Sequence, residues 1–160
     1  MKPKTKPAAW TEVKIDLTID APQKRVWDAL VNDANCWWPK SFYTSEKTKR
    51  FTIEPRLGGR MFEDHGKGEG LVWYTVHGIE SPNYLWLIGY MGPPFGGPLS
   101  SILRLTLTAA GANGTKLEIT DSLFGQVAGC DQESGWRAIF DEHFRAHVEA
   151  TRNRRSRKSA

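Results

Sequence analysis

The chain has 160 residues, 39% of them hydrophobic and 11% aromatic, which is enough for one domain with a hydrophobic core and too short for two typical domains. The formal net charge is +4, but eight basic residues and no acidic ones lie in residues 1–6 and 152–160, so residues 7–151 carry a net charge of −4. This argues against specific nucleic-acid binding, which needs a basic patch on the folded surface. We interpret residues 1–10 and 152–160 as disordered basic tails around a domain at residues 11–151.

Several classes of site are missing from the sequence. Cys36 and Cys130 are the only cysteines, and no CxxC, HExxH or GxxxxGK[ST] pattern occurs. We therefore expect no metal and no cofactor. No apolar run near the N-terminus is long enough for a secretory signal or a membrane span, so we expect a cytoplasmic protein with free thiols and no membrane association.

The first elements are a strand and two short helical pieces. Apolar and polar residues alternate over residues 13–19, the pattern of a strand with one buried face. Asp20-Ala21-Pro22 then begins a helix that ends near Asn32. One more helical turn is expected over residues 33–38, before Pro39.

A run of strands separated by turn residues follows. The expected strands lie at residues 51–54, 59–64, 71–79, 84–91, 102–108 and 115–124. No segment repeats, so solenoids and propellers are excluded.

The last element is a long amphipathic helix over residues 130–151. Its large apolar residues recur every three or four positions, at Trp136, Ile139, Phe140, Phe144 and Val148. This stripe has to cover the sheet, because no other large helix is available. We predict an α+β fold in which an antiparallel sheet of about seven strands wraps around this helix and leaves a cavity beside it.

Five short motifs in this order resemble a known family. They are Ala21-Pro22 with Val26-Trp27 and Ala29-Leu30, then Trp38-Pro39, Gly58-Gly59-Arg60 with Phe62, Pro82 with Leu85, and Gly114-Thr115 with Leu117. The chain resembles the SRPBCC superfamily, with its helix-grip fold of the START and birch-pollen-allergen type. Within it, the chain is most similar to the domain shared by activators of heat-shock chaperone ATPases and polyketide cyclase-like proteins. The resemblance covers residues 13–148 and implies a helix-grip fold whose cavity binds hydrophobic small molecules. Relatives often carry Trp near position 89, where this chain has Gly89, which implies a more open pocket there.

Asp121 is the most unusual polar residue of the predicted core. It shares the inward face of its strand with Leu117, Ile119 and Leu123. A carboxylate on an apolar face requires hydrogen bonds or a raised pKa. Asp121 is therefore a ligand anchor, an acid or base, or a satisfied structural group. His77, which alternates with Trp73 and Thr75, is the only residue we pair with it as a catalytic candidate.

The seven tryptophans suggest aromatic cavity walls. The predicted ligand-binding residues are Trp38, Phe62, Trp73, Trp86, Asp121, Trp136 and Phe140, with Trp38 and the loop at residues 92–98 at the entrance. The strands at residues 71–79 and 84–91 are apolar on both faces, so the pattern leaves their inward face open. His143 and His147, spaced i, i+4, are interpreted as a solvated helix flank and not as metal ligands.

The expected function is binding of a hydrophobic or aromatic small molecule. A cyclase or hydrolase of polyketide-like substrates is the alternative that would use Asp121 and His77. A chaperone-interaction module is a third hypothesis, and a homodimer is a further possible partner state. The sequence contains no recognisable catalytic triad, and this argues against an acyl-transfer enzyme.

Overall fold

The computed structural model describes residue 3 and residues 5–150. Seven strands form one antiparallel sheet in the order β1-β7-β6-β5-β4-β3-β2. The strands are β1 (Ala9–Ile19), β2 (Arg50–Ile53), β3 (Arg60–Gly66), β4 (Glu69–Glu80), β5 (Tyr84–Met91), β6 (Leu99–Ala109) and β7 (Thr115–Gly125). β1 begins at Ala9, so Trp10 belongs to the sheet and not to a loose leader. The predicted tail at residues 152–160 lies outside the described residues.

The helices follow the expected order. α1 (Gln23–Asn32) and α2 (Ala34–Trp37) connect β1 to β2, with the short turn η1 (Lys40–Phe42) after them and η2 (Pro93–Phe95) between β5 and β6. α3 (Gln132–Trp136) and η3 (Arg137–Arg145), a segment with π-helical hydrogen bonding, run into a last helical stretch at residues 146–150. We call residues 132–150 the C-terminal helix. The Asp131 side chain accepts a hydrogen bond from the Ser134 backbone N–H and caps its start.

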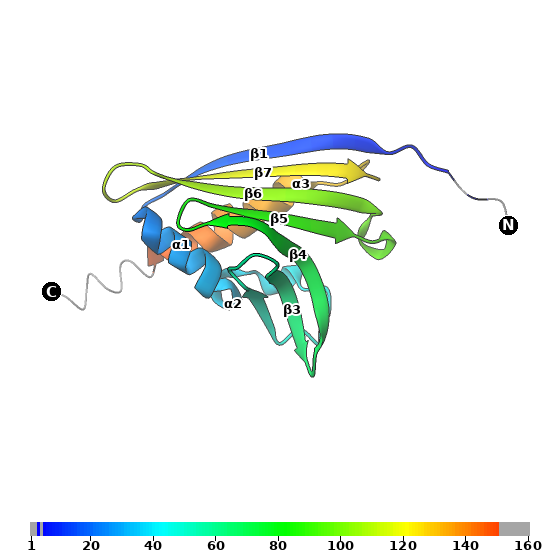
Figure 1. Ribbon diagram of the computed structural model, residues 1–160, viewed down its shortest axis with the longest axis horizontal. Helices are drawn as coiled ribbons and strands as arrows, with labels where there is room; N and C mark the ends of the chain where they lie inside the picture. The colour runs from blue at the N-terminus through cyan, green and yellow to red at the C-terminus, as the bar shows by residue number, and fades with distance from the viewer. Residues whose placement is uncertain (1–2, 4, 151–160) are drawn as a thin grey trace.

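The C-terminal helix lies across the concave face of the sheet, and α1 and α2 lie at one end of it (Figure 1). The apolar stripe of the C-terminal helix is buried against the sheet. Each of its five large residues is at most 3% exposed: Trp136, Ile139, Phe140, Phe144 and Val148. On the sheet side, β7 buries Leu117, Ile119, Asp121 and Leu123, as the alternation predicted. The predicted α+β helix-grip fold is confirmed.

β4 is the strand that gives the sheet its shape. Its first half pairs with β3 through residues 69–75, and its second half pairs with β5 from Tyr74 to Glu80. One register shift leaves Trp73 unpaired between Val72 and Tyr74, and another lies between Val76 and Gly78. Such bulges bend a strand and increase its twist, and Figure 1 shows β4 curving away from β5 toward β3. The two strands separate beyond the Tyr74–Gly89 pair.

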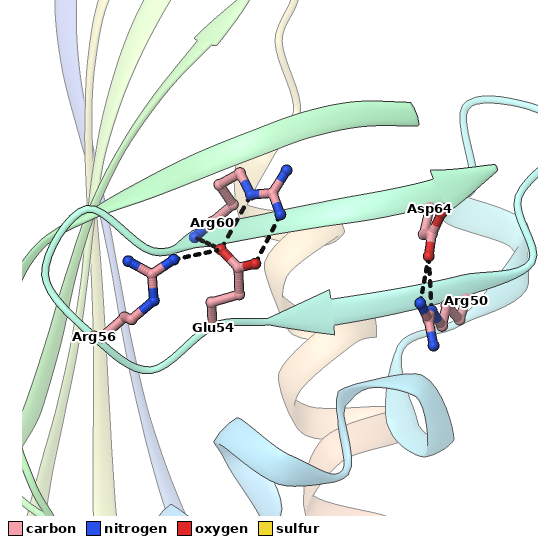
Figure 2. A network of polar contacts seen from close by, with 5 residues as sticks. All are labelled: Arg50, Glu54, Arg56, Arg60 and Asp64. Atoms are coloured by element: carbon pink, nitrogen blue, oxygen red, sulfur yellow. Dashed lines mark hydrogen bonds and ion pairs between the residues drawn. The ribbon is translucent and has the colours of Figure 1, made fainter. Parts of the chain in front are cut away.

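The β2–β3 hairpin at the far edge carries ion pairs on its outer side (Figure 2). Arg60 Nη2 lies 2.7 Å from Glu54 Oε1, and Arg50 Nη2 lies 2.7 Å from Asp64 Oδ2. Hydrogen bonding from Arg60 lowers the pKa of Glu54 to about 2. These contacts fix the hairpin register from the solvent side.

Candidate functional site

A cavity of about 470 Å³ lies where β4 and β5 separate. One wall comes from residues 71–74 of β4 and the other from residues 89–92, at the end of β5. Gln132, Gly135, Trp136 and Ile139 of the C-terminal helix close one side, and residues 42–44 close another. The volume lies in the range typical of small-molecule sites.

Gly89 permits the close approach of β4 and β5 at the last pair before the strands separate. A Cβ atom on Gly89 would lie 2.3 Å from the Trp73 carbonyl oxygen and 2.8 Å from the Tyr74 ring. No other residue type fits without a shift of the backbone. A tryptophan at this position would therefore not fit against β4.

Two tryptophans line the cavity, and each donates its indole N–H to a buried carboxylate. Trp136 Nε1 donates to Asp121 Oδ2 at 2.7 Å, and Trp73 Nε1 donates to Glu63 Oε1 at 2.8 Å. Both carboxylates are 0% exposed. These bonds hold the two indole rings in one orientation in the cavity wall.

Glu63 is saturated by the segment that covers the cavity. It accepts hydrogen bonds from the Thr44 backbone N–H at 3.0 and 3.1 Å, from Thr44 Oγ1 at 3.1 Å and from Thr48 Oγ1. We call residues 42–48 the covering segment. Desolvation, and to a smaller extent the Glu63 charge, raises the pKa of Tyr43 in this segment. Tyr43 is therefore a neutral hydroxyl beside the cavity.

Asp121 lies behind the cavity wall. Its Oδ1 accepts from Ser101 Oγ at 2.5 Å, and Ser101 Oγ lies 2.7 Å from the Tyr74 hydroxyl. Ser101 and Tyr74 both line the cavity, whereas Asp121 is not part of the lining and is linked to it through Ser101 and Trp136. Desolvation raises the pKa of Asp121, and the hydrogen bonds from Ser101 and Trp136 oppose that shift. Asp121, Ser101 and Tyr74 form a polar chain that leads from the core to the cavity.

The structure separates the residues predicted from the sequence into three groups. Trp73 and Trp136 line the cavity, and Asp121 lies one hydrogen bond behind it. Trp38 and Phe140 are buried in the core next to the cavity. Trp38 stacks on Phe51 with 3.8 Å between ring centroids, and Phe140 contacts Trp136.

Phe62, Trp86 and His77 lie on the outer face of the sheet, contrary to the sequence interpretation. The Arg60 guanidinium covers the Phe62 ring at 4.3 Å, and His77 packs edge-on against the half-exposed Trp86 at 4.9 Å. His77 faces outward because the register of β4 is irregular. The irregularity places Trp73 at the cavity but turns Thr75 and His77 outward. Asp121 and His77 therefore lie on opposite faces and do not form an acid–base pair.

Some site residues were not predicted. Glu63 follows Met61 on the inward face of β3, so alternation was the available signal for it. Tyr74 and Ser101 carried no such signal, because a bulge and a three-dimensional contact define their roles. Gly92 and Phe95 of the predicted entrance loop do line the cavity.

The described residues contain no group of three His, Cys, Asp or Glu side chains that could hold a metal ion. His147 Nε2 lies 3.0 Å from Asp33 Oδ2 and joins the C-terminal helix to the α1–α2 corner, while His143 is exposed. None of the helices within residues 5–150 is long and apolar enough to cross a membrane.

No known family model and no functionally curated protein matches the chain. Solved structures do match. An uncharacterized protein from Rhizobium leguminosarum is 16% identical, with a TM-score of 0.67 over 90% of this chain and 97% of that one. An AHSA1-like protein from Aeromonas hydrophila is 18% identical, with a TM-score of 0.60 over 88% and 94%. An anthrahydroquino-γ-pyrone synthase is 21% identical, with a TM-score of 0.50 over 69% and 75%. These similarities support the helix-grip fold and, at such low identity, the fold alone.

Proposed function

We propose that the protein binds a hydrophobic or aromatic small molecule in the cavity between β4, β5 and the C-terminal helix. The observation that carries this proposal is the cavity itself, whose 470 Å³ are lined mainly by aromatic and aliphatic side chains. Apolar walls with few convergent polar groups are typical of ligand sites. Here the few polar side chains of the lining include the buried pair Tyr74 and Ser101.

A fluorescent apolar probe tests the proposal. N-phenyl-1-naphthylamine should gain fluorescence on binding to the native protein, and naphthalene should displace it. Absence of probe uptake by the folded protein would contradict the proposal.

Filling the cavity should abolish that uptake without unfolding the protein. Gly135 lies in the cavity wall, and a Cβ atom there would meet only Phe42, at an ordinary contact distance of 3.7 Å. Gly135→Leu should therefore fold, and it should gain up to about 1 kcal/mol of helix propensity. Ser134→Leu, on the exposed side of the same turn, is the matched control and should keep probe binding.

An enzyme of the cyclase or hydrolase class would need an acid or base in contact with the bound molecule. Asp121 is separated from the cavity by Ser101, and His77 lies on the other face of the sheet. The geometry thus favours binding over turnover. An Asp121→Asn variant that binds the probe normally but loses turnover of a polyketide-like substrate would favour the enzyme instead.

The outer face of the sheet favours a second candidate function, contact with a partner protein. Trp10 pairs with Phe124, and Phe124 and Tyr90 both pair with Ser100, so three exposed aromatic rings lie in one row across four strands. They are 64%, 59% and 81% exposed, respectively for Trp10, Phe124 and Tyr90. Exposed apolar patches of this kind commonly mark interaction sites. Sedimentation velocity would reveal a homodimer, and titration with a purified chaperone ATPase would test the chaperone hypothesis, with Tyr90→Ser weakening either contact.

A further inference from the structure

The polar chain of Tyr74, Ser101 and Asp121 has a direction. The Ser101 Oγ–Asp121 Oδ1 distance of 2.5 Å lies in the range of a hydroxyl donating to an ionised carboxylate. Trp136 Nε1–H donates to the other carboxylate oxygen. With the Ser101 proton directed to Asp121, the 2.7 Å contact between Ser101 Oγ and the Tyr74 hydroxyl can be made only by the Tyr74 proton.

The consequence concerns what the cavity offers to a ligand. Both hydroxyl protons of the chain are used inside the protein, and each hydroxyl oxygen keeps a lone pair. Ser101 and Tyr74 line the cavity. A ligand that donates a hydrogen bond matches this end of the cavity. A ligand carbonyl oxygen would instead face the hydroxyl oxygens of Ser101 and Tyr74 with no proton between them.

We infer that the cavity selects apolar or aromatic molecules that carry a hydroxyl donor, such as phenols and alcohols, and that Asp121 imposes this selection through Ser101 and Tyr74. The inference rests on the proposed binding function and names its ligand class. Asp121 is a positioning residue here, because it acts through two hydroxyl groups.

Because Trp136 fixes one side of residue 121, a single substitution at Asp121 should reverse the direction of the hydrogen bonds from Tyr74 through Ser101. In Asp121→Asn the amide oxygen has to face the Trp136 indole N–H, because the amide NH₂ would oppose it there. The NH₂ then faces Ser101 and donates to Oγ. Ser101 in turn donates to Tyr74, and the Tyr74 proton is released toward the cavity. The variant should therefore prefer ligands that accept a hydrogen bond.

Four naphthalenes of similar shape test this by isothermal titration calorimetry. 2-Naphthol donates and accepts, 2-methoxynaphthalene and 2-acetylnaphthalene only accept, and naphthalene does neither. The native protein should bind 2-naphthol about tenfold more tightly than the other three, the size of effect expected for one hydrogen bond to a buried polar group. Asp121→Asn should bind 2-acetylnaphthalene several-fold more tightly than the native protein does.

The controls separate this inference from the proposed function. Ser101→Ala should reduce the preference for 2-naphthol, and Ser100→Ala, one residue away on the outward face of β6, should keep it. Equal affinity of the native protein for all four compounds, or an unchanged order in Asp121→Asn, would overturn the inference while leaving the binding function intact. If naphthalene and the other three all fail to bind, both are overturned. Should Asp121→Asn not fold, the comparison of Ser101→Ala with Ser100→Ala decides.

Discussion

Asp121 and Glu63 hold equivalent places on two sides of the cavity but have different roles. Each is a fully buried carboxylate that accepts the indole N–H of a cavity tryptophan. The remaining hydrogen bonds of Glu63 come from Thr44 and Thr48, so they join the covering segment to the sheet. The remaining hydrogen bond of Asp121 comes from Ser101 and leads through it to Tyr74 at the cavity. The comparison shows that the donors around a buried carboxylate decide whether it serves the fold or the ligand.

The largest expected effect is that of Glu63→Ala. Removing this carboxylate leaves Trp73 Nε1, the Thr44 N–H and two hydroxyl groups without their acceptor in a buried place. We expect the free energy of unfolding to fall by about 3–4 kcal/mol. Hydrogen exchange at the Thr44 amide should also accelerate, because the covering segment loses its anchor.

Asp64→Ala is the matched control for that change, because the neighbouring Asp64 pairs with Arg50 on the outer side of the hairpin. It should lower the free energy of unfolding in urea denaturation far less than Glu63→Ala does, because water screens an exposed ion pair. Equal losses for Glu63→Ala and Asp64→Ala would show that the covering segment is held by other contacts.

Trp136→Phe tests whether Asp121, which has fewer hydrogen-bond donors than Glu63, depends more strongly on each of them. The substitution removes one of two donors to Asp121, and we expect a loss of about 2–3 kcal/mol in unfolding free energy. It should also raise the pKa of Asp121 further, since the Trp136 hydrogen bond opposes the effect of burial. Denaturation and a carboxyl-carbon NMR titration measure the two effects.

Trp73→Phe should cost less than Trp136→Phe, because Glu63 keeps its hydrogen bonds from Thr44 and Thr48. If the order of the two variants were reversed, the number of donors would not be what distinguishes the two carboxylates.

The sequence predicted the parts of this site that depend on regular periodicity. The stripe of the C-terminal helix predicted Trp136 at the core, and the alternation in β7 predicted that Asp121 points inward. Periodicity could not predict the register shifts of β4, because nothing in the residue types at 73 or 77 distinguishes a bulge from a regular strand. Each shift reverses the faces counted from the other end of the strand, which is why the inward face of residues 71–79 stayed open and His77 remained a candidate. The cavity also escaped a residue-level prediction, because it arises where β4 leaves β5 and pairs with β3.

Asp121→Asn should change stability little at pH 7 and should remove a dependence on pH. Burial raises the pKa of Asp121 above its ordinary value of 3.8, so the native state binds the proton more readily than the unfolded chain does. The stability linked to this group is therefore complete below pH 3.8 and is lost as the pH rises through the native pKa. Tyr74 is the titratable group linked to Asp121 through Ser101. Burial and the charge of Asp121 raise the pKa of Tyr74, so Tyr74 stays neutral.

The measurement is the difference in unfolding free energy between the native protein and Asp121→Asn as a function of pH. Common effects of all other carboxylates cancel in this difference. We expect the native protein to gain stability relative to the variant as the pH falls. A flat difference would show that Asp121 has the same proton affinity in the folded and unfolded chains.

Glu54→Gln completes the comparison with a carboxylate that has three hydrogen-bond donors and a nearby Arg56 but faces solvent. Glu54 accepts from the Arg60 side chain at 2.7 and 3.1 Å and from its backbone N–H at 2.9 Å, and Arg56 lies 3.8 Å away (Figure 2). These contacts lower the pKa of Glu54 from 4.5 to about 2, the opposite direction to Asp121. Its contribution is therefore present above pH 4.5 and is lost as the pH falls toward 2.

Water screens this ion pair and replaces its hydrogen bonds when it is broken, so Glu54→Gln should cost less than about 1 kcal/mol in denaturation at pH 7. Added salt should reduce the difference further. A loss as large as that of Glu63→Ala would mean that the number of donors, and not burial, sets the energetic weight of a carboxylate in this protein.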